Sequence, residues 1–387
     1  MSQHDAEAAV IGVGSIGSMA LWRLAGRGVT VHGFDQFGVP HDRSAMGGET
    51  RMFRSTSPRE PVYVPFGSAA LALWRELEAQ TGRELLRLNG ELVLGPANAE
   101  HIVNVLESVR AYGLEHELLD TGDVAARYPQ HRLWPGDIGI LDPNAGYLRP
   151  ELAVLSAAQR ARELGAVVHT YTPVLRVEID GDGVSVVTED RTFRYGRVIV
   201  AGGPWVDRLA PQLAGKIQVR RPIQVWYAAD DPAAYTPERF PIALRPEDDG
   251  FYAFPSLDGA TVKVGPTGPF KEVVPDPDLL ERTVGVDEVR TLDAIVARCL
   301  PGLHPDPVRV SAHMDGYTSD NRPIAGFAAG TDRVVLLGGF SGLGFKYAPA
   351  FGEAGTELLL DGSTTFDLKP FAPGRDLADW TTPPASG

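Results

Sequence analysis

The feature that most constrains the fold is a glycine-rich turn near the start of the chain, set between an apolar run and a helical stretch. In chain order, the segments are the apolar run 8–13, the overlapping turn Gly12-Val13-Gly14-Ser15-Ile16-Gly17, the helical stretch 18–26 and a second apolar run, 29–34. Asp35 follows the second run directly. A strand, a glycine turn, a helix and a second strand that ends at an acid form a βαβ unit of the kind that binds a dinucleotide.

The residues of this turn have separate physical roles. Gly12 makes the tight turn, Gly14 lets a pyrophosphate approach the backbone, and Gly17 lets the helix pack on the strand. Ser15 and Ile16 then lie near the helix N-terminus, where free N–H groups and the helix dipole favour phosphates.

Asp35 narrows the choice of nucleotide. Its carboxylate is expected to accept hydrogen bonds from ribose hydroxyls, and an acid at this position disfavours the 2′-phosphate of NADP. NAD and FAD both remain compatible with the motif. A glycine-rich turn without a ligand is the simpler alternative, but the order of strand, turn, helix and acid favours the nucleotide.

The length, charge and cysteine content of the chain exclude several classes of protein. The 387 residues are enough for roughly two or three domains, and no stretch approaches the ~18 apolar residues of a membrane span. The formal charge of −14 disfavours nucleic acid and anionic membranes as partners. Cys299 is the single cysteine, so no internal disulfide can form, and we expect a cytoplasmic protein.

Other catalytic motifs are absent from the sequence. The run 339–343 ends in leucine where a nucleophile elbow needs glycine. No Walker lysine motif occurs, and no two histidines have the i, i+4 spacing of a zinc helix, so we expect no metal site. Cys299 lies in an apolar helical stretch, which is typical of a buried structural thiol.

The other end of the chain carries a second glycine-rich turn. The apolar run 333–337 leads into the turn 338–346, and a helix is expected over 349–360. Between these two ends, short strands dominate from about residue 218 to 319; one of them is expected over 218–228. The simplest packing brings both ends of the chain into one domain and makes the middle a second domain.

Further short motifs accompany the two glycine turns. They are Gly48-Glu49-Thr50-Arg51-Met52-Phe53-Arg54, Tyr63-Val64-Pro65, Tyr252-x-Phe254-Pro255, Lys263-Val264-Gly265 and Gly339-Phe340-Ser341-Gly342-x-Gly344-Phe345-Lys346. Over nearly the whole chain, this set resembles the D-amino-acid-oxidase-like flavoproteins, and most of all their branch of monomeric sarcosine oxidases and N-methyltryptophan oxidases. The set is far more specific than either glycine turn alone.

The resemblance implies a reaction, a cofactor and an assembly state. In that family the cofactor is FAD, a secondary amino acid is oxidised at its C–N bond to an imine, and O2 is reduced to hydrogen peroxide. The reactants would thus be a small-molecule amino acid and O2, and the protein a monomer. The cofactor positions carried over are Gly12, Gly14, Ser15, Ile16, Gly17, Asp35, Arg51, Gly203, Gly342, Gly344, Phe345 and Lys346.

The resemblance also implies catalytic roles. Arg54 and Lys346 match the pair that holds the substrate carboxylate, and Lys263 matches the lysine that activates O2. Arg51 matches an arginine beside the flavin ring, and Tyr252 matches a wall residue of the substrate cavity. The chemistry is consistent, because two cations can fix a carboxylate and so orient the adjacent C–N bond. A cation beside the flavin also stabilises the charge that develops on O2.

Two positions depart from the sarcosine oxidases. Asp315 stands in place of the cysteine that those enzymes join to the flavin, so we expect FAD to be bound non-covalently. Thr267 stands where they have a substrate-site histidine, so a larger or different amine is expected in place of sarcosine. The substrate side chain stays open between sarcosine, N-methyl aromatic and cyclic amino acids.

The sequence therefore predicts an α/β fold of two domains. A Rossmann-like FAD-binding domain is expected from residues 5–90, 148–219 and 320–371, and an antiparallel-sheet substrate domain from 91–147 and 220–319. Two other functions remain open: a flavin dehydrogenase that passes electrons to another acceptor, and a flavin-binding subunit without turnover. Lys263 favours the oxidase over the first, and the paired cations Arg54 and Lys346 argue against the second.

Overall fold

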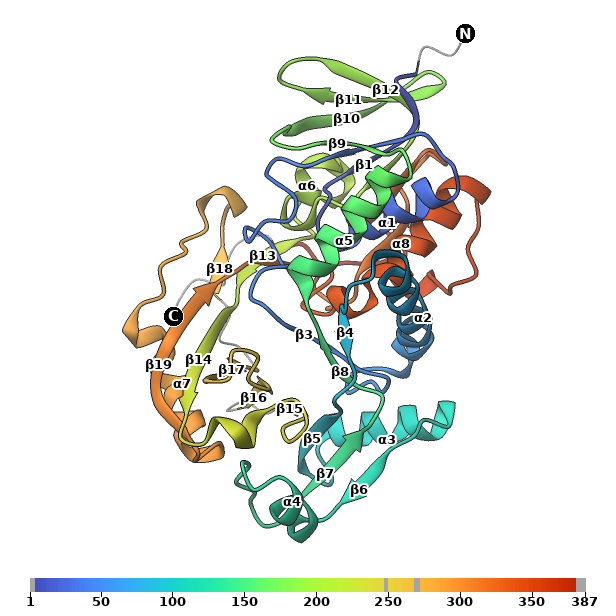
Figure 1. Cartoon of the computed structure of the whole chain (residues 1–387). Helices are drawn as coiled ribbons and strands as arrows, with labels where there is room; N and C mark the ends of the chain where they lie inside the picture. Colours follow the sequence, from blue (N-terminus) through green and yellow to red (C-terminus); the bar gives the residue numbers. More distant parts are fainter. Residues whose placement is uncertain (1–3, 247–249, 268–271, 381–387) are drawn as a thin grey trace.

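Two large sheets organise the molecule, which the computed structural model describes over residues 4–246, 250–267 and 272–380 (Figure 1). The first is an 8-stranded sheet in the order β10-β11-β12-β1-β2-β9, with β22 beside β12 and β21 beside β22. Its strands are β1 (Ala6–Ile11), β2 (Val31–Phe34), β9 (Val167–His169), β10 (Val174–Asp180), β11 (Gly183–Thr188), β12 (Thr192–Val200), β21 (Ile324–Phe327) and β22 (Val334–Gly338). The pairs that join β22, β12, β1, β2 and β9 are parallel, as a dinucleotide-binding fold requires.

Four helices bury the main core of this sheet. They are α1 (Ser15–Gly26), α2 (Val64–Thr81), α5 (Pro150–Glu163) and α8 (Gly344–Asp361). α1 packs against α5 and α8, and α2 packs against α8 (Figure 1). The crossing of α1 and α8 is close, because a Cβ at Gly352 would lie 2.8 Å from the backbone nitrogen of Ala20. The helix that begins at the second glycine turn is thus packed directly on the helix that begins at the first.

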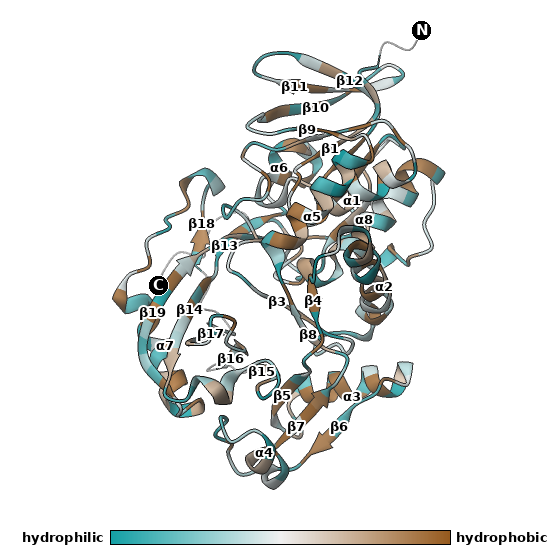
Figure 2. Ribbon diagram, viewed as in Figure 1, coloured by the Kyte–Doolittle hydropathy of each residue, from teal (hydrophilic) through white to brown (hydrophobic). Residues whose placement is uncertain are grey.

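The second sheet is also 8-stranded, in the order β19-β14-β17-β16-β15-β5-β7-β6, and its pairs are antiparallel apart from β5 with β15. Its strands are β5 (Glu91–Pro96), β6 (Glu117–Leu119), β7 (Asp137–Asp142), β14 (Ile223–Ala229), β15 (Ile242–Arg245), β16 (Phe251–Phe254), β17 (Thr261–Pro266) and β19 (Leu303–Ala312). Helix α7 (Val286–Cys299) packs on β19, and α3 (Glu100–Tyr112) packs on β5. β5 and β7 are largely brown in Figure 2, and their side chains fill the cores under α3 and α4 (Thr121–Arg127).

Two small sheets lie between the large ones (Figure 1). One joins β3 (Arg51–Phe53), β8 (Gly146–Leu148) and β4 (Leu86–Arg87). The other joins β18 (Glu272–Val274), β13 (Gln218–Arg221) and β20 (Asp315–Tyr317). Each carries a residue singled out in the sequence, because β3 begins at Arg51 and β20 begins at Asp315.

The predicted α/β fold class is confirmed. The strands of the first sheet come from residues 6–34, 167–200 and 324–338, and those of the second from 91–142 and 223–312. The predicted domain ranges stay a prediction.

Two predicted elements differ from the structure. The helix expected over 349–360 begins earlier, at Gly344. The strand expected over 218–228 is divided at Pro222, which has no N–H for a ladder hydrogen bond.

Two further expectations concern absent features. Within the described ranges, no helix is long and apolar enough to cross a membrane. No group of three or more potential metal-ligating side chains occurs in the same part of the chain.

His131 makes the fold sensitive to acid. Its imidazole is buried and stacks on Phe240 and Phe251, and neither ring nitrogen has a hydrogen-bond partner among the described residues. Burial, with a smaller contribution from Arg245, lowers the pKa of His131 from 6.5 to about 3. The ring therefore stays neutral in the folded chain at pH values where it is protonated in the unfolded chain. The stability from this residue is complete above pH 6.5 and is lost as the pH falls toward 3.

We expect His131 alone to lower the free energy of unfolding by about 1.4 kcal/mol between about pH 7.5 and pH 5.5. His131→Phe keeps a flat ring between the two aromatic side chains and removes the titration. Denaturant unfolding at both pH values measures the difference between wild type and variant, and the exposed His116, changed to Gln, is the control. Equal acid sensitivity of wild type and His131→Phe would contradict this role.

Candidate active site

The first of two connected cavities has a volume of about 380 Å³ and lies at the carboxyl ends of β1, β2 and β12. Ligands of open α/β sheets bind at this edge. Of the predicted cofactor residues, those that line it are Gly12, Gly14, Ser15, Ile16, Asp35, Arg51, Gly203, Gly342, Gly344 and Phe345. The other two lie apart from it, since Gly17 packs α1 against β1 and Lys346 lines the second cavity.

The first glycine turn has the backbone shape that a pyrophosphate site needs. Gly12 has a φ of +88°, and a Cβ there would lie 2.4 Å from the Ala201 carbonyl oxygen. A Cβ at Gly17 would lie 1.8 Å from the Gly12 carbonyl oxygen, so both positions require glycine. α1 begins at Ser15, and no side chain caps its N-terminus. Its first N–H groups are therefore available to an anion at the cavity.

Asp35 is held in place by the backbone around it. Its carboxylate accepts hydrogen bonds from the N–H groups of Val13 (3.0 Å) and Phe37 (2.9 Å), and it is 6% exposed. The His41 Nε2 atom lies 3.5 Å from one of its oxygens. The carboxylate thus has a fixed position at the cavity wall, where the sequence predicts a contact to ribose.

The second glycine turn brings another helix N-terminus to the same cavity. Ser341 and Gly342 have φ values of +53° and +78°. Asp315 closes the turn, because its carboxylate accepts hydrogen bonds from the N–H groups of Gly316 (2.9 Å) and Gly342 (2.7 Å). Because α8 begins at Gly344, Lys346 lies in the first helical turn, whereas the sequence suggested a loop.

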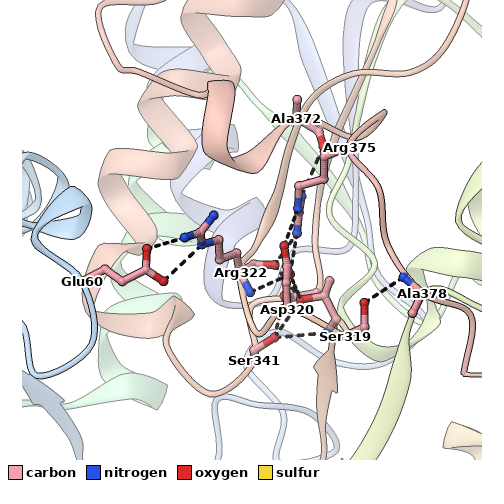
Figure 3. A network of polar contacts seen from close by, with 10 residues as sticks. Glu60, Ser319, Asp320, Arg322, Ser341, Ala372, Arg375 and Ala378 are labelled. Atoms are coloured by element: carbon pink, nitrogen blue, oxygen red, sulfur yellow. Dashed lines mark hydrogen bonds and ion pairs between the residues drawn. The ribbon is translucent and has the colours of Figure 1, made fainter. Parts of the chain in front are cut away.

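A polar network supports this turn from outside (Figure 3). Asp320 pairs with Arg375 of the C-terminal segment at 2.8 Å, and Arg322 pairs with Glu60 at 2.6 Å. The Arg322 N–H donates to Asp320 at 3.0 Å, which joins the two pairs, and Figure 3 shows Ser341 beside them. Glu60 and Asp320 also line the second cavity, so the network fixes part of its rim.

The second cavity has a volume of about 710 Å³ and continues from the first. The residues that line both are Ala45, Arg51, Asp315, Gly342 and Phe345. The structure brings the five predicted catalytic residues together at its wall, namely Arg51, Arg54, Tyr252, Lys263 and Lys346. Their roles stay predictions.

Lys263 projects from β17 and is 2% exposed. Its Nζ donates to the carbonyl oxygens of Gly48 (2.9 Å) and Thr50 (2.7 Å) and lies 4.2 Å from the centre of the Phe254 ring. Burial, followed by the charge of Arg51, lowers the pKa of Lys263 well below its usual value. The carbonyl oxygens and the ring face oppose that effect because they stabilise the ammonium form.

Arg51 lies beside this lysine. Its guanidinium donates to the carbonyl oxygens of Thr50 (2.8 Å) and Ala45 (2.6 Å). One orientation of the Gln224 side-chain amide makes two hydrogen bonds. In it the amide oxygen accepts from Arg51 at 3.2 Å, and the amide nitrogen donates to the Gly48 carbonyl oxygen at 3.1 Å. In that orientation Gln224 takes no hydrogen bond from Lys263, which keeps one N–H for a group in the cavity.

Arg54 and Lys346 are each 7% exposed and line the same cavity. Arg54 Nη2 pairs with Glu91 Oε1 at 2.7 Å, whereas Arg54 Nε has no hydrogen-bond partner among the described residues. Lys346 Nζ donates to the Leu343 carbonyl oxygen at 3.2 Å. Burial lowers the pKa of Lys346 well below its usual value, and the Arg54 charge adds to this shift. Two buried cations with N–H groups to spare can bind a carboxylate.

Tyr252 lines the same cavity. It lies on β16 across from Gly265 of β17, where a Cβ would lie 2.1 Å from the Tyr252 ring. Burial raises the pKa of Tyr252, so its hydroxyl stays protonated at neutral pH. The motif Lys263-Val264-Gly265 therefore has a physical basis, since alternate residues of one strand supply an ammonium group and the space for a ring.

Three residues of this region were not among the predicted site residues. Glu91 contacts Arg54, and Trp226 lies opposite Lys263 in the pairing of β14 with β17. His313 lines the second cavity, and burial lowers its pKa to about 3, so the ring is neutral at neutral pH. None of the three lies in a recognisable motif, because strand pairing between distant segments brings them to the site.

The described residues fit FAD. A Cβ would lie within 3.0 Å of another atom at Gly12 and Gly17 of the first turn and at Gly339 and Gly344 of the second. Each turn precedes a helix whose N-terminus no side chain caps, which suits a pyrophosphate. Asp35 would hold the ribose, and Arg51 with the second turn would hold the end that faces the second cavity. The continuity of the two cavities suits a cofactor that reaches from a nucleotide site to a reaction site.

Comparisons with known proteins agree with this geometry. The model of the family described as FAD dependent oxidoreductase matches residues 7–358. Monomeric sarcosine oxidase of Streptomyces avermitilis is 32% identical over 370 residues, which cover 95% of this chain and 96% of that protein. N-methyl-L-tryptophan oxidase of Salmonella arizonae is 29% identical over 372 residues, 95% of this chain and 98% of that protein. The open form of NikD, an unusual amino acid oxidase essential for nikkomycin biosynthesis, has the same fold, with a TM-score of 0.84 and 24% identity. The match covers 97% of this chain and 98% of the NikD chain.

The position of Asp315 predicts a cofactor held without a covalent bond. Both carboxylate oxygens accept backbone N–H groups, and a carboxylate in this place cannot form the thioether that a cysteine could. We expect acid precipitation of the purified protein to release all FAD into the supernatant, as measured by absorbance of supernatant and pellet. Flavin retained by the pellet would contradict this and would indicate a covalent bond to the protein. His313, which lines the cavity, would then be the candidate residue, whereas Cys299 is buried in the core under α7.

Proposed function

The chain belongs to the FAD dependent oxidoreductase family and takes FAD as its cofactor, and we propose from this premise that it oxidises the C–N bond of a secondary or N-alkylated amino acid to an imine, with O2 reduced to hydrogen peroxide. The observation that carries the proposal is the buried pair Arg54 and Lys346 on a cavity that Lys263 also lines. The substrates named for the two relatives, sarcosine and N-methyl-L-tryptophan, are N-methyl amino acids and support the same class. A monomer in the cytoplasm belongs to the same proposal.

The clamp of Arg54 and Lys346 binds and orients the substrate. The unused N–H groups of Arg54 and the Lys346 ammonium hold the carboxylate, which fixes the adjacent Cα–N bond in one direction. When bound, FAD would supply the two-electron acceptor for the hydride equivalent that leaves a carbon next to nitrogen, while the nitrogen loses a proton and the C–N bond becomes C=N. Tyr252 and the apolar side chains around it exclude water from the reacting centre.

Lys263 places a positive charge on the wall of the second cavity, beside Arg51, which lines both cavities. Its acceptors are neutral carbonyl oxygens, so the charge is solvated by the backbone and is not cancelled by a carboxylate. A fixed cation of this kind lowers the energy of an anion that forms beside it, as O2 does when it takes its first electron. This feature favours an oxidase over the alternative dehydrogenase.

The cavity wall supports a substrate larger than sarcosine. The cavity of about 710 Å³ would also receive one end of FAD, so its lining and not its volume carries this argument. Its apolar lining includes Met52, Leu244, Pro246, Pro266 and Met314. Thr267 adds one hydroxyl to this surface. A substituent with several apolar carbons, on the nitrogen or on Cα, matches such a wall.

Substrates should require a carboxylate. Loss of one partner of a desolvated charge pair costs roughly 2–5 kcal/mol, so Arg54→Ala should raise KM by more than about tenfold. Anaerobic mixing with N-methyl and cyclic amino acids, followed by absorbance of the flavin, tests the proposed function and the clamp together. The matched probes are the same amines without the carboxylate, which should bleach the flavin far more slowly. Equal bleaching by the decarboxylated amines would refute the clamp, and no bleaching by any amino acid would refute the function.

Lys263→Met should slow reoxidation of the reduced flavin by O2 without an equal effect on reduction of the flavin by the amino acid. Methionine keeps most of the side-chain volume, so packing should survive. Loss of one fixed cation costs on the order of 3 kcal/mol, so reoxidation of the reduced enzyme by O2 should slow by about 10²–10³-fold. Anaerobic reduction by substrate should change far less. Stopped-flow mixing measures both steps.

The pH dependence of reoxidation gives an independent check of Lys263. Because burial lowers the pKa of this lysine, its charge is lost as the pH rises through a value below 10.5. Reoxidation of the wild type should slow over that rise, while Lys263→Met should be slow throughout. Wild-type rates in the variant would show that O2 reacts elsewhere and would favour the dehydrogenase.

A further inference from the structure

Glu91 is a buried acid that the proposed function does not use. It begins β5, its side chain is 0% exposed, and its Oε1 lies 2.7 Å from Arg54 Nη2. Apart from this ion pair, neither carboxylate oxygen has a hydrogen-bond partner among the described residues. Arg54 is thus its one direct ion-pair partner among the described residues. A buried charge with a single partner responds strongly to any change at that partner.

Charged groups from three elements face Glu91. Arg54 acts from the segment after β3, Lys346 from α8, and Asp142 from β7, where it is the strand partner of Glu91. Asp142 has donors of its own, including the N–H (3.0 Å) and the hydroxyl (2.8 Å) of Ser55. Its charge is therefore compensated locally. Arg54, Lys346 and Glu91 remain as one electrostatic cluster on the cavity wall, and the charges of Arg59 and Asp315 also act on Lys346.

This cluster has too little positive charge for a second carboxylate. Burial raises the pKa of Glu91 to about 7, against the opposing effect of Arg54, and lowers the pKa of Lys346 well below its usual value. At weakly alkaline pH, where Glu91 is ionised, Arg54 and Glu91 cancel each other, and burial disfavours the charged form of Lys346. A substrate carboxylate beside Arg54 would place two anions on one guanidinium in a poorly screened interior. The negative charge of the substrate carboxylate therefore favours the protonated forms of Glu91 and Lys346.

We propose that Glu91 is a positioning residue of the carboxylate clamp, which holds Arg54 in the free enzyme, and that the cluster takes up one proton from solvent for each substrate carboxylate it binds. The proton goes to a Glu91 oxygen or to the Lys346 nitrogen, and no other bond changes. This inference rests on the proposed function, because it needs a carboxylate at Arg54. Its consequence is that substrate affinity falls as the pH rises above the point where Glu91 ionises in the free enzyme.

Calorimetry on the FAD-loaded enzyme measures the proton directly. The probe is cyclopentanecarboxylate, which has a carboxylate but no C–N bond to oxidise. Titration at about pH 8 in HEPES and in Tris, which differ in ionisation enthalpy, gives the number of protons taken up. We expect about one proton per carboxylate bound, and a Kd that rises up to about tenfold per pH unit. In steady state, KM should carry this pH dependence and kcat should not.

Glu91→Gln isolates the acid, because its amide can still accept from Arg54 but carries no charge. The variant should take up less than about half a proton, and its Kd should depend only weakly on pH. Glu100→Gln is the matched control, since Glu100 lines the same cavity but is exposed; it should behave as the wild type.

The outcomes separate this inference from the proposed function. Carboxylate binding by the wild type without proton uptake would overturn the role of the cluster and leave the proposed function intact. Equal uptake by Glu91→Gln and wild type would overturn the role of Glu91 alone. Failure of the wild type to bind any carboxylate would overturn both. The wild-type proton count decides the main point even where the variant is unstable.

Discussion

The buried ammonium group of Lys263 is the contact on which the rest of the site depends. Its bonds to the Gly48 and Thr50 carbonyl oxygens tie β17 of the second sheet to the segment that leads into β3. A charge removed from water must keep such acceptors, so the distance between these two segments is fixed. Gly48 permits the approach, since it has a φ of +99° and a Cβ there would lie 2.0 Å from Gln224. Arg51 follows at once in the chain, and the junction of the two cavities is set by the same contact.

The four buried or half-buried cations of the site are compensated in two different ways. Lys263 and Arg51 bond to neutral carbonyl oxygens, which solvate charge without cancelling it. Arg54 is paired with a carboxylate, that of Glu91, and Lys346 bonds to one carbonyl oxygen. Among the described residues, no carboxylate therefore pairs with Lys263 or Arg51, while at the proposed carboxylate clamp the Glu91 carboxylate already shares Arg54. The charges of Lys263 and Arg51 therefore suit a transient anion, whereas the clamp of Arg54 and Lys346 suits a substrate that must bind and leave.

The parts of the site that local sequence determines were predictable. Gly12 and Gly17 are needed for steric reasons within one turn, and Asp35 ends the next strand, so the dinucleotide cavity could be placed from the sequence. Glu91 could not be predicted as a site residue, because the pairing of β5 with β15 and β7 brings it to Arg54. No motif near it in the chain indicates that contact. The start of α8 was misplaced because Pro349 is typical of a first helical turn. The helix instead begins at the glycine turn and tolerates the proline near its start, where one hydrogen bond is lost.

The charge of the whole chain bears on how this site selects its ligand. The formal charge of −14 gives an average field that repels an anion, yet the cavity is lined by Arg51, Arg54, Lys263 and Lys346. In physiological salt, surface charges act over only about 8 Å, whereas buried charges are screened much less. The attraction for a carboxylate therefore arises inside the cavity, after the ligand has left bulk water, and not during its approach. Discrimination between a carboxylate and a neutral analogue should then appear mainly in the rate of dissociation, because the four cations act only on a ligand that is already bound.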